Sequence, residues 1–237
     1  MNVNIDVEQI VNRYQNVCSQ LSHYIRDEKH PQFVLVTKNQ PVALILNLLQ
    51  HLESPIFGEN RVSEALSKIE KCEASNAEWH YIGHLQRNKV KSILGKFTLI
   101  HSLADIKLAK EIEKRAVTIG QNVNCLIQID ISEDGTKFGF PPDQSYLIDL
   151  MNELTQMSHL QIKGLMTIAP FIPSEETRPY FRKMRSIFDV LAEQSPHLRN
   201  IEMEILSMGM SNDYIVALEE GSTMIRIGSA IFEDQSS

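Results

Sequence analysis

The sequence lacks the features that mark nucleic-acid-binding and membrane proteins. Its 237 residues include 23 Lys and Arg against 30 Asp and Glu, a formal charge of −7, and they contain no polybasic block. No stretch approaches the roughly 18 apolar residues of a membrane span, and no basic N-terminal region precedes an apolar run. We therefore expect a soluble, cytoplasmic protein that binds neither nucleic acid nor membranes.

Cysteine is also scarce, and familiar metal and nucleotide motifs are missing. Cys18, Cys72 and Cys125 are widely spaced and odd in number, which predicts neither a disulfide framework nor a zinc site. His80 and His84 lie in H-Y-I-G-H, which lacks the glutamate of H-E-x-x-H, so we expect packing or loop hydrogen bonding from them. The loops G-x-G-x-x-G and G-x-x-x-x-G-K-[ST] are absent, which argues against a dinucleotide-binding or P-loop domain.

The apolar residues are arranged as short strands that alternate with helices. Near the N-terminus, apolar positions recur at three- and four-residue steps, which predicts an amphipathic helix over about residues 6–28. Helices are expected after each strand, the last of them from Ser211. The predicted strands are Phe33–Thr37, Pro55–Phe57, Trp79–Gly83, Thr98–Leu103, Val123–Ile131, Ile162–Ile168, Met203–Gly209 and Thr223–Phe232.

Eight apolar strands alternating with helices predict a (β/α)₈ TIM barrel, an α/β fold. No repeat, low-complexity tract or linker divides the sequence, so we expect a single domain over residues 1–237. The alternative is an open doubly wound sheet, which more often carries one of the absent glycine loops. In a barrel the C-terminal ends of all strands meet at one mouth, and this expectation selects the residues to consider.

Lys38 stands at the C-terminal end of the first predicted strand, before an Asn-Gln-Pro turn. A lysine held among apolar neighbours loses hydration, which lowers its pKa and favours the neutral amine that attacks an aldehyde. This position therefore suits a Schiff base. The alternative is a lysine that ends the strand and reaches into water.

Two groups of hydrogen-bond donors follow the last two predicted strands. Gly209 allows close backbone approach, and Ser211 is expected to open a helix whose free amides and dipole attract an anion. Gly228 and Ser229 add a second group after the eighth strand, and barrels commonly bind phosphate after strands seven and eight. The alternative for Ser211 is an ordinary N-cap.

Arg226 and Asn60 are further candidates at strand ends. Arg226 shares one side of its strand with Gly228, and its guanidinium would keep the nitrogen of a bound heterocycle unprotonated because adjacent positive charges repel. The alternative is a structural ion pair with Glu204 or Glu219. Asn60 follows the second strand and suits both an N-cap and a ligand contact, which the sequence does not separate.

Several segments together resemble one known family. In order, VTKNQP, FGENRVSEAL, WHYIGHLQRNKVK, IHSL, GLMTIAP and LSMGMSNDYIVALEEGSTMIRIGSAIF resemble the YggS/PROSC-like pyridoxal 5′-phosphate (PLP) homeostasis proteins, from about Val36 to Phe232. The resemblance implies a barrel like the N-terminal domain of alanine racemase, with PLP held as an internal aldimine on Lys38. It also implies that Arg226 faces the pyridine nitrogen. The other cofactor contacts that it implies are Asn60, Ser207, Gly209, Ser211, Gly228 and Ser229.

The family resemblance leads us to expect a PLP-binding regulator or carrier, monomeric, with PLP-dependent apo-enzymes as candidate recipients. Alanine racemase takes a second base from a C-terminal β-domain of its partner, and no residues remain after the last predicted strand to build one. The alternative is a PLP-dependent amino-acid racemase with Tyr81, His84 or Tyr214 as the base. A third possibility is an apo barrel that acts only through protein contacts.

Overall fold

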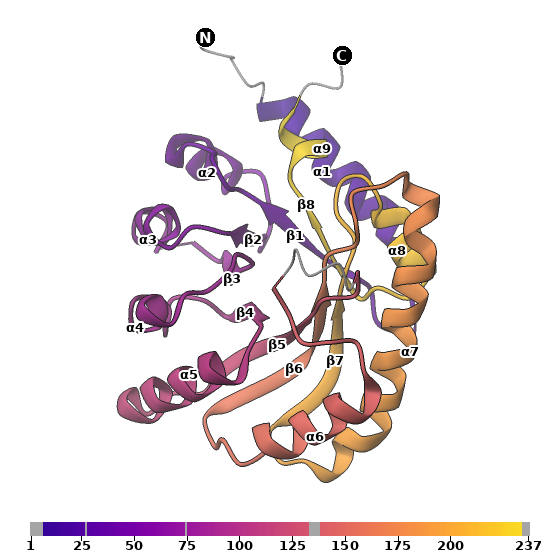
Figure 1. The fold of residues 1–237 in the computed structure, drawn as a ribbon. Coiled ribbons are helices and arrows are strands. Elements are labelled where there is room, and N and C mark those ends of the chain that lie inside the picture. Colours follow the sequence, from indigo (N-terminus) through magenta and orange to yellow (C-terminus); the bar gives the residue numbers. More distant parts are fainter. Residues whose placement is uncertain (1–6, 27, 74, 133–137, 234–237) are drawn as a thin grey trace.

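Eight parallel strands close into a barrel in the order β1 to β8, and helices surround them (Figure 1). This computed structural model describes residues 7–26, 28–73, 75–132 and 138–233. The closed topology confirms the predicted (β/α)₈ barrel, while the single domain over residues 1–237 stays a prediction. The strands are β1 (Gln32–Val36), β2 (Ile56–Glu59), β3 (Glu78–Tyr81), β4 (Leu99–Leu103), β5 (Val123–Ile129), β6 (Leu160–Thr167), β7 (Ile201–Ser207) and β8 (Met224–Ile227).

The helices follow the strands as the sequence predicts, and two of them have the side-chain caps that fix a helix start. Asp105 accepts a hydrogen bond from the amide of Leu108 (2.8 Å), and Asp143 accepts one from Tyr146 (2.8 Å). No helix of the described ranges is long and apolar enough to cross a membrane. The helices are α1 (Val7–Leu21), α2 (Val42–Leu48), α3 (Val62–Lys71), α4 (Val90–Ile93), α5 (Ile106–Ile119), α6 (Gln144–Leu154), α7 (Arg178–Gln194), α8 (Tyr214–Glu219) and α9 (Ser229–Phe232).

Several elements begin or end at other residues than predicted, and three of these differences are large. The N-terminal helix, expected over about 6–28, ends at Leu21 and continues only as a 3₁₀ turn to Tyr24, because the backbone of Ile25 is extended. Residues 6 and 27 lie outside the described residues. β8 stops at Ile227 instead of running to Phe232, since the Gly228 carbonyl accepts the first helical bonds of α9. The helix expected from Ser211 begins at Tyr214.

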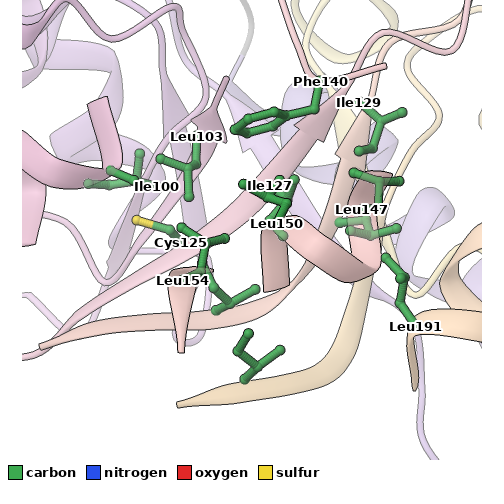
Figure 2. Close-up of a cluster of buried hydrophobic side chains, with 14 of the residues drawn as sticks. Ile100, Leu103, Cys125, Ile127, Ile129, Phe140, Leu147, Leu150, Leu154 and Leu191 are labelled. Atoms are coloured by element: carbon green, nitrogen blue, oxygen red, sulfur yellow. The ribbon is translucent and has the colours of Figure 1, made fainter. Parts of the chain in front are cut away.

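The apolar core lies on both sides of the barrel wall, with two clusters outside it and one inside it. The outer part packs strands against helices, and Figure 2 shows part of it, in which Ile100 of β4 and Ile127 of β5 belong to the same cluster as Leu147, Leu150 and Leu154 of α6. The inner part takes residues from strands alone, so it fills the barrel interior. Its buried members are Val34, Leu99, Leu126, Met166 and Met224.

Candidate functional site

The barrel interior changes from apolar to polar towards the C-terminal ends of the strands. Because side chains two residues apart share one side of a strand, the residues that follow the inner apolar cluster also point inward. His101 follows Leu99, Gln128 follows Leu126 and Arg226 follows Met224 in this way. Five buried side chains form this polar layer: His80, His101, Gln128, Ser207 and Arg226.

The next residues along the strands form the mouth of the barrel. Val36 pairs in register with Gly58, and Val34 pairs with Arg226. The residues two positions beyond Val36, Gly58, Ser207 and Arg226 therefore come to the same end of the barrel, above the polar layer. These residues are Lys38, Asn60, Gly209 and Gly228, four of the candidates that the sequence predicts.

Lys38 lies in the turn that follows β1, and its side chain is exposed. The predicted loss of hydration among apolar neighbours is therefore wrong, because the residue has left the strand that carries those neighbours. Its ammonium makes no hydrogen bond or ion pair with any described residue. The structure thus places an amine at the mouth that is available to a ligand.

The segments after β7 and β8 touch, as the predicted pair of donor groups requires. The amide of Ala230 donates to Ser211 Oγ (3.2 Å), and Ser229 beside it is exposed. Ser211 does not open a helix, however, so both the helix-end argument and the N-cap alternative are wrong. A turn precedes α8, in which Asp213 accepts a hydrogen bond from the Met210 amide (2.7 Å).

Gly228 allows the end of β8 to approach the end of β1. A Cβ atom built on this residue would lie 3.0 Å from the Val36 carbonyl oxygen and 3.2 Å from the Val36 Cβ atom. Any side chain there would push apart the two strand ends just before Lys38. Glycine therefore brings the Gly228–Ser229 segment next to the turn that carries the amine.

Arg226 is buried inside the barrel and bonded to neutral groups. Its guanidinium donates to Ser207 Oγ (2.6 Å) and to the Thr167 carbonyl oxygen (2.8 Å). Burial lowers the pKa of Arg226 to about 10, while the nearby Asp213 carboxylate opposes this shift. The side chain is still cationic at neutral pH. The alternative of an ion pair with Glu204 or Glu219 is wrong, because Glu204 pairs with Lys29 and Glu219 pairs with Arg178.

A chain of hydrogen bonds continues from Arg226 across the polar layer. Ser207 Oγ lies 3.1 Å from His101 Nδ1, and His101 Nε2 lies 3.1 Å from His80 Nδ1. An arginine only donates, so Ser207 accepts from it. The directions of the other two bonds follow from the tautomers of the two imidazoles. Both imidazoles are neutral in this arrangement, as burial requires, since it lowers the pKa of each.

We expect this buried pair to make the protein less stable in mild acid. The pKa of His101 lies well below its usual value in the folded chain, because burial opposes protonation and the charge of Arg226 adds to this effect. Below about pH 6.5 the unfolded chain therefore binds a proton at this residue that the folded chain does not. Between about pH 7 and pH 5, His101 alone is expected to lower the free energy of unfolding by up to about 2 kcal/mol.

Urea denaturation at both pH values measures this effect in the wild type and in His101→Gln. On acidification, the free energy of unfolding is expected to fall less in the variant than in the wild type, by up to about 2 kcal/mol, whatever the stability of the variant at neutral pH. His51→Gln, at an exposed histidine, serves as the control and should keep the wild-type pH dependence. An unchanged pH dependence in His101→Gln would contradict the proposed neutral pair.

Asn60 has a buried acceptor without a partner. Its Oδ1 atom makes no hydrogen bond with the described residues, and Arg61, not Asn60, occupies the position before α3. The N-cap alternative for Asn60 is therefore wrong. A buried oxygen without a donor is unfavourable by about 1–3 kcal/mol unless a ligand or water supplies one. Asn60 is thus suited to contact a bound molecule.

The three residues named as alternative bases make contacts within the protein. The hydroxyl of Tyr81 donates to the backbone oxygen of His84 (3.3 Å), and the Tyr214 hydroxyl donates to Gln20 Oε1 on α1 (2.7 Å). The His84 ring stacks on Phe138, with 3.7 Å between ring centroids. The described residues contain no group of three or more His, Cys, Asp or Glu that could hold a metal ion.

Sequence reasoning missed several residues that support the mouth. His101 lies in the quoted segment IHSL and Thr167 in GLMTIAP, but nothing in their spacing indicates that they join Ser207 and Arg226. Glu59, Glu64 and Lys68 were also missed; they form a partly buried ion cluster under the turn that contains Lys38. The signal that identifies these three residues is the burial of their charged side chains, and this burial is known only from the folded structure.

The fold and the mouth define a barrel of the alanine racemase N-terminal type. Residues 5–236 match the family model described as alanine racemase, N-terminal domain. The solved alanine racemase of Clostridium difficile 630 has the same fold, with a TM-score of 0.75 over 98% of this chain and 57% of that chain. At 13% identity, this likeness concerns the fold alone.

Relatives with higher sequence identity show which family within this class the chain belongs to. The chain is 36% identical over 236 residues to the pyridoxal phosphate homeostasis protein of Aquifex aeolicus (strain VF5), covering 99% of both sequences. PipY of Synechococcus elongatus PCC7942, solved with PLP bound, gives a TM-score of 0.80 at 32% identity, over 94% of this chain and 99% of that chain. This chain belongs to the pyridoxal phosphate homeostasis protein family, which confirms the resemblance seen in its sequence.

Proposed function

We propose that this protein binds PLP, holds it covalently through Lys38, and acts as a carrier or regulator in PLP homeostasis. The proposal rests above all on the arrangement of groups at the mouth of the barrel. The exposed Lys38 amine has no hydrogen-bond partner among the described residues, the buried Arg226 cation lies below it, and the segments after β7 and β8 touch beside it. Relatives at 34–36% identity are named for PLP homeostasis, and PipY has a structure with PLP bound.

The residues at the mouth fit the chemical groups of PLP. Bound PLP supplies an aldehyde carbon, which an amine attacks, and a pyridine ring that withdraws electrons. The Lys38 amine is available to the aldehyde, and the unpartnered Asn60 oxygen is available to a donor on the cofactor. The cofactor's phosphate would lie between Gly209 and Ser211 on one side and the Gly228–Ser229 segment on the other. Ser207 would affect the cofactor indirectly, through its hydrogen bond with Arg226.

Arg226 favours a carrier over a catalyst. Its side chain is cationic at neutral pH, and a cation facing the ring nitrogen disfavours protonation of that nitrogen. An unprotonated pyridine ring withdraws electron density less strongly than a protonated one, so it stabilises carbanions poorly. The hydroxyls of Tyr81 and Tyr214, two candidate bases for a racemase, are directed to acceptors within the protein. These contacts argue against either tyrosine as the base of a racemase.

Adding PLP to the purified protein tests the binding, and deuterated water tests the absence of catalysis. PLP is expected to produce a saturable absorption change that borohydride alters irreversibly. The loaded protein, incubated with a panel of L-amino acids in deuterated water, is expected to show no stereospecific exchange of the α-proton at enzyme-like rates. Such exchange would overturn the carrier role. A spectrum unchanged by PLP would instead favour an apo barrel that acts through protein contacts.

The transfer partners and the assembly state belong to the same proposal. PLP-dependent apo-enzymes are the expected recipients, and transfer would be followed as activity gained by such an apo-enzyme mixed with the loaded protein. A monomer and a cytoplasmic location stay predictions from the sequence. Molecular mass by light scattering, with and without PLP, tests the first of them.

A further inference from the structure

Three charged residues form a cluster beneath the turn that contains Lys38. Lys68 of α3 is almost fully buried, with 2% of its side chain exposed, and Glu59 at the end of β2 is fully buried. The ammonium of Lys68 lies 2.7 Å from Glu59 Oε1 and 2.7 Å from Glu64 Oε1. We call Glu59, Glu64 and Lys68 the charged clamp.

The charged clamp holds the residues on both sides of Lys38. On one side, Lys68 donates to the Thr37 carbonyl oxygen (2.7 Å), and the Thr37 hydroxyl donates to Glu59 (2.6 Å). On the other side, the amide of Asn39 donates to Glu64 (2.7 Å). The bonds made by the Lys68 ammonium and the Glu64 carboxylate involve an ionised group, which makes them stronger than bonds between neutral groups.

The turn needs such support because its conformation is unusual. Asn39 adopts a left-handed backbone with φ of 63°, which few residues other than glycine adopt. The Arg61 guanidinium also donates to Asn39 Oδ1 (3.2 Å), while the Lys38 side chain itself makes no hydrogen bond or ion pair with a described residue. The position of the amine therefore depends on how firmly residues 37 and 39 are held.

Packing α3 on the barrel through buried charged residues is energetically unfavourable. Removing charges from water opposes folding, and well-packed apolar residues often replace a buried ion pair without loss of stability. One oxygen of Glu59, Oε2, has no partner at all within the described structure, which adds to the cost. A role in packing alone does not explain this arrangement, whereas three bonds to the neighbours of Lys38 do.

We propose that the charged clamp positions Lys38 for covalent attachment to PLP, an inference that rests on the proposed function. In that step the neutral amine nitrogen adds to the aldehyde carbon, and its two protons leave with the former carbonyl oxygen as water when the C=N bond forms. The clamp residues form no bond to the cofactor. They are positioning residues, which reduce the orientational freedom that the amine would otherwise lose during attachment.

The deciding variant is Glu64→Met, measured both with Lys38 present and in a Lys38→Ala background. Glu64 retains 24% side-chain exposure, so its loss leaves the buried Lys68–Glu59 pair intact. With Lys38 present, the variant is expected to weaken PLP binding and to slow borohydride-trapped attachment, each about tenfold or more, as for one lost charged hydrogen bond. In a Lys38→Ala background, the same substitution should change noncovalent PLP affinity less than about twofold.

Glu111→Met is the matched control, because Glu111 and Arg115 on α5 form another ion pair four residues apart at 2.7 Å, with similar exposure of the glutamate. It should change neither binding nor attachment. Thr37→Val, which removes only the hydroxyl bond to Glu59, is the second variant and should behave as Glu64→Met does. Equal losses with and without Lys38 would indicate a loosened barrel and overturn the inference, as would no loss in either background. Failure of the proposed function would differ, since the wild type itself would then form no trapped adduct.

Discussion

Lys38→Ala is expected to abolish covalent attachment of PLP completely while leaving part of the noncovalent binding. The amine of Lys38 is the attachment group in the proposed site, whereas Ser211, Gly228 and Ser229 remain to hold the phosphate. The absorption change on adding PLP should therefore lose its borohydride-sensitive component, and an intact mass should show no retained cofactor after reduction. Peptide mapping of the reduced wild type should locate the adduct on Lys38.

Lys29→Ala is the control for this experiment. Lys29 precedes the same strand at the opposite end of the barrel and has 77% of its side chain exposed, so its loss should leave the adduct unchanged. A reduced adduct that persists in Lys38→Ala would identify another lysine as the attachment point. That result would contradict the assignment of Lys38 without contradicting PLP binding.

The order of strands and helices could be predicted because it depends on local patterns. Each predicted strand overlaps an observed one, since a run of apolar residues bounded by turns carries its own signal. The end of β8 could not be predicted in the same way. The four residues of α9 are too few to show a helical period, and they continue the apolar run of the strand.

The location of the site could be predicted for a topological reason, but its internal contacts could not. Barrel strands end at one mouth, so Lys38 and Gly228 are brought together wherever the barrel closes. The bond between His80 and His101 depends on the register of β3 on β4, and the burial of Lys68 depends on how α3 packs. Neither has a signal in the spacing of residues along the chain.

Two errors about the site have one physical cause: both residues lie beyond the regular element that was used to interpret them. Lys38 was expected to share the apolar surroundings of its strand, yet it lies in the following turn and is exposed. Ser211 was expected to begin a helix, yet the Asp213 side chain folds back onto the Met210 amide and delays α8 until Tyr214.

The largest effect on stability is expected from Gly164→Ala, in the strand that supports β7. Gly164 has φ of 141°, and a Cβ atom there would lie 1.9 Å from the Ile205 carbonyl oxygen. The backbone of β7 would have to move, at the point where the register between β6 and β7 already shifts. We expect a loss of at least about 4 kcal/mol in the free energy of unfolding, measured by urea denaturation.

Gly120→Ala separates this clash from the conformational preference of glycine. Gly120 ends α5 with φ of 64°, and a Cβ atom there would meet nothing within 4 Å, so its replacement should destabilise the protein by only about 1–2 kcal/mol. Because β7 leads into Ser207 and its bond with Arg226, any folded Gly164→Ala protein should also bind PLP more weakly than Gly120→Ala. Equal destabilisation by the two substitutions would show that the β7 backbone can move to accommodate the added Cβ atom. The mouth would then be less rigid than the close contact at Gly164 indicates.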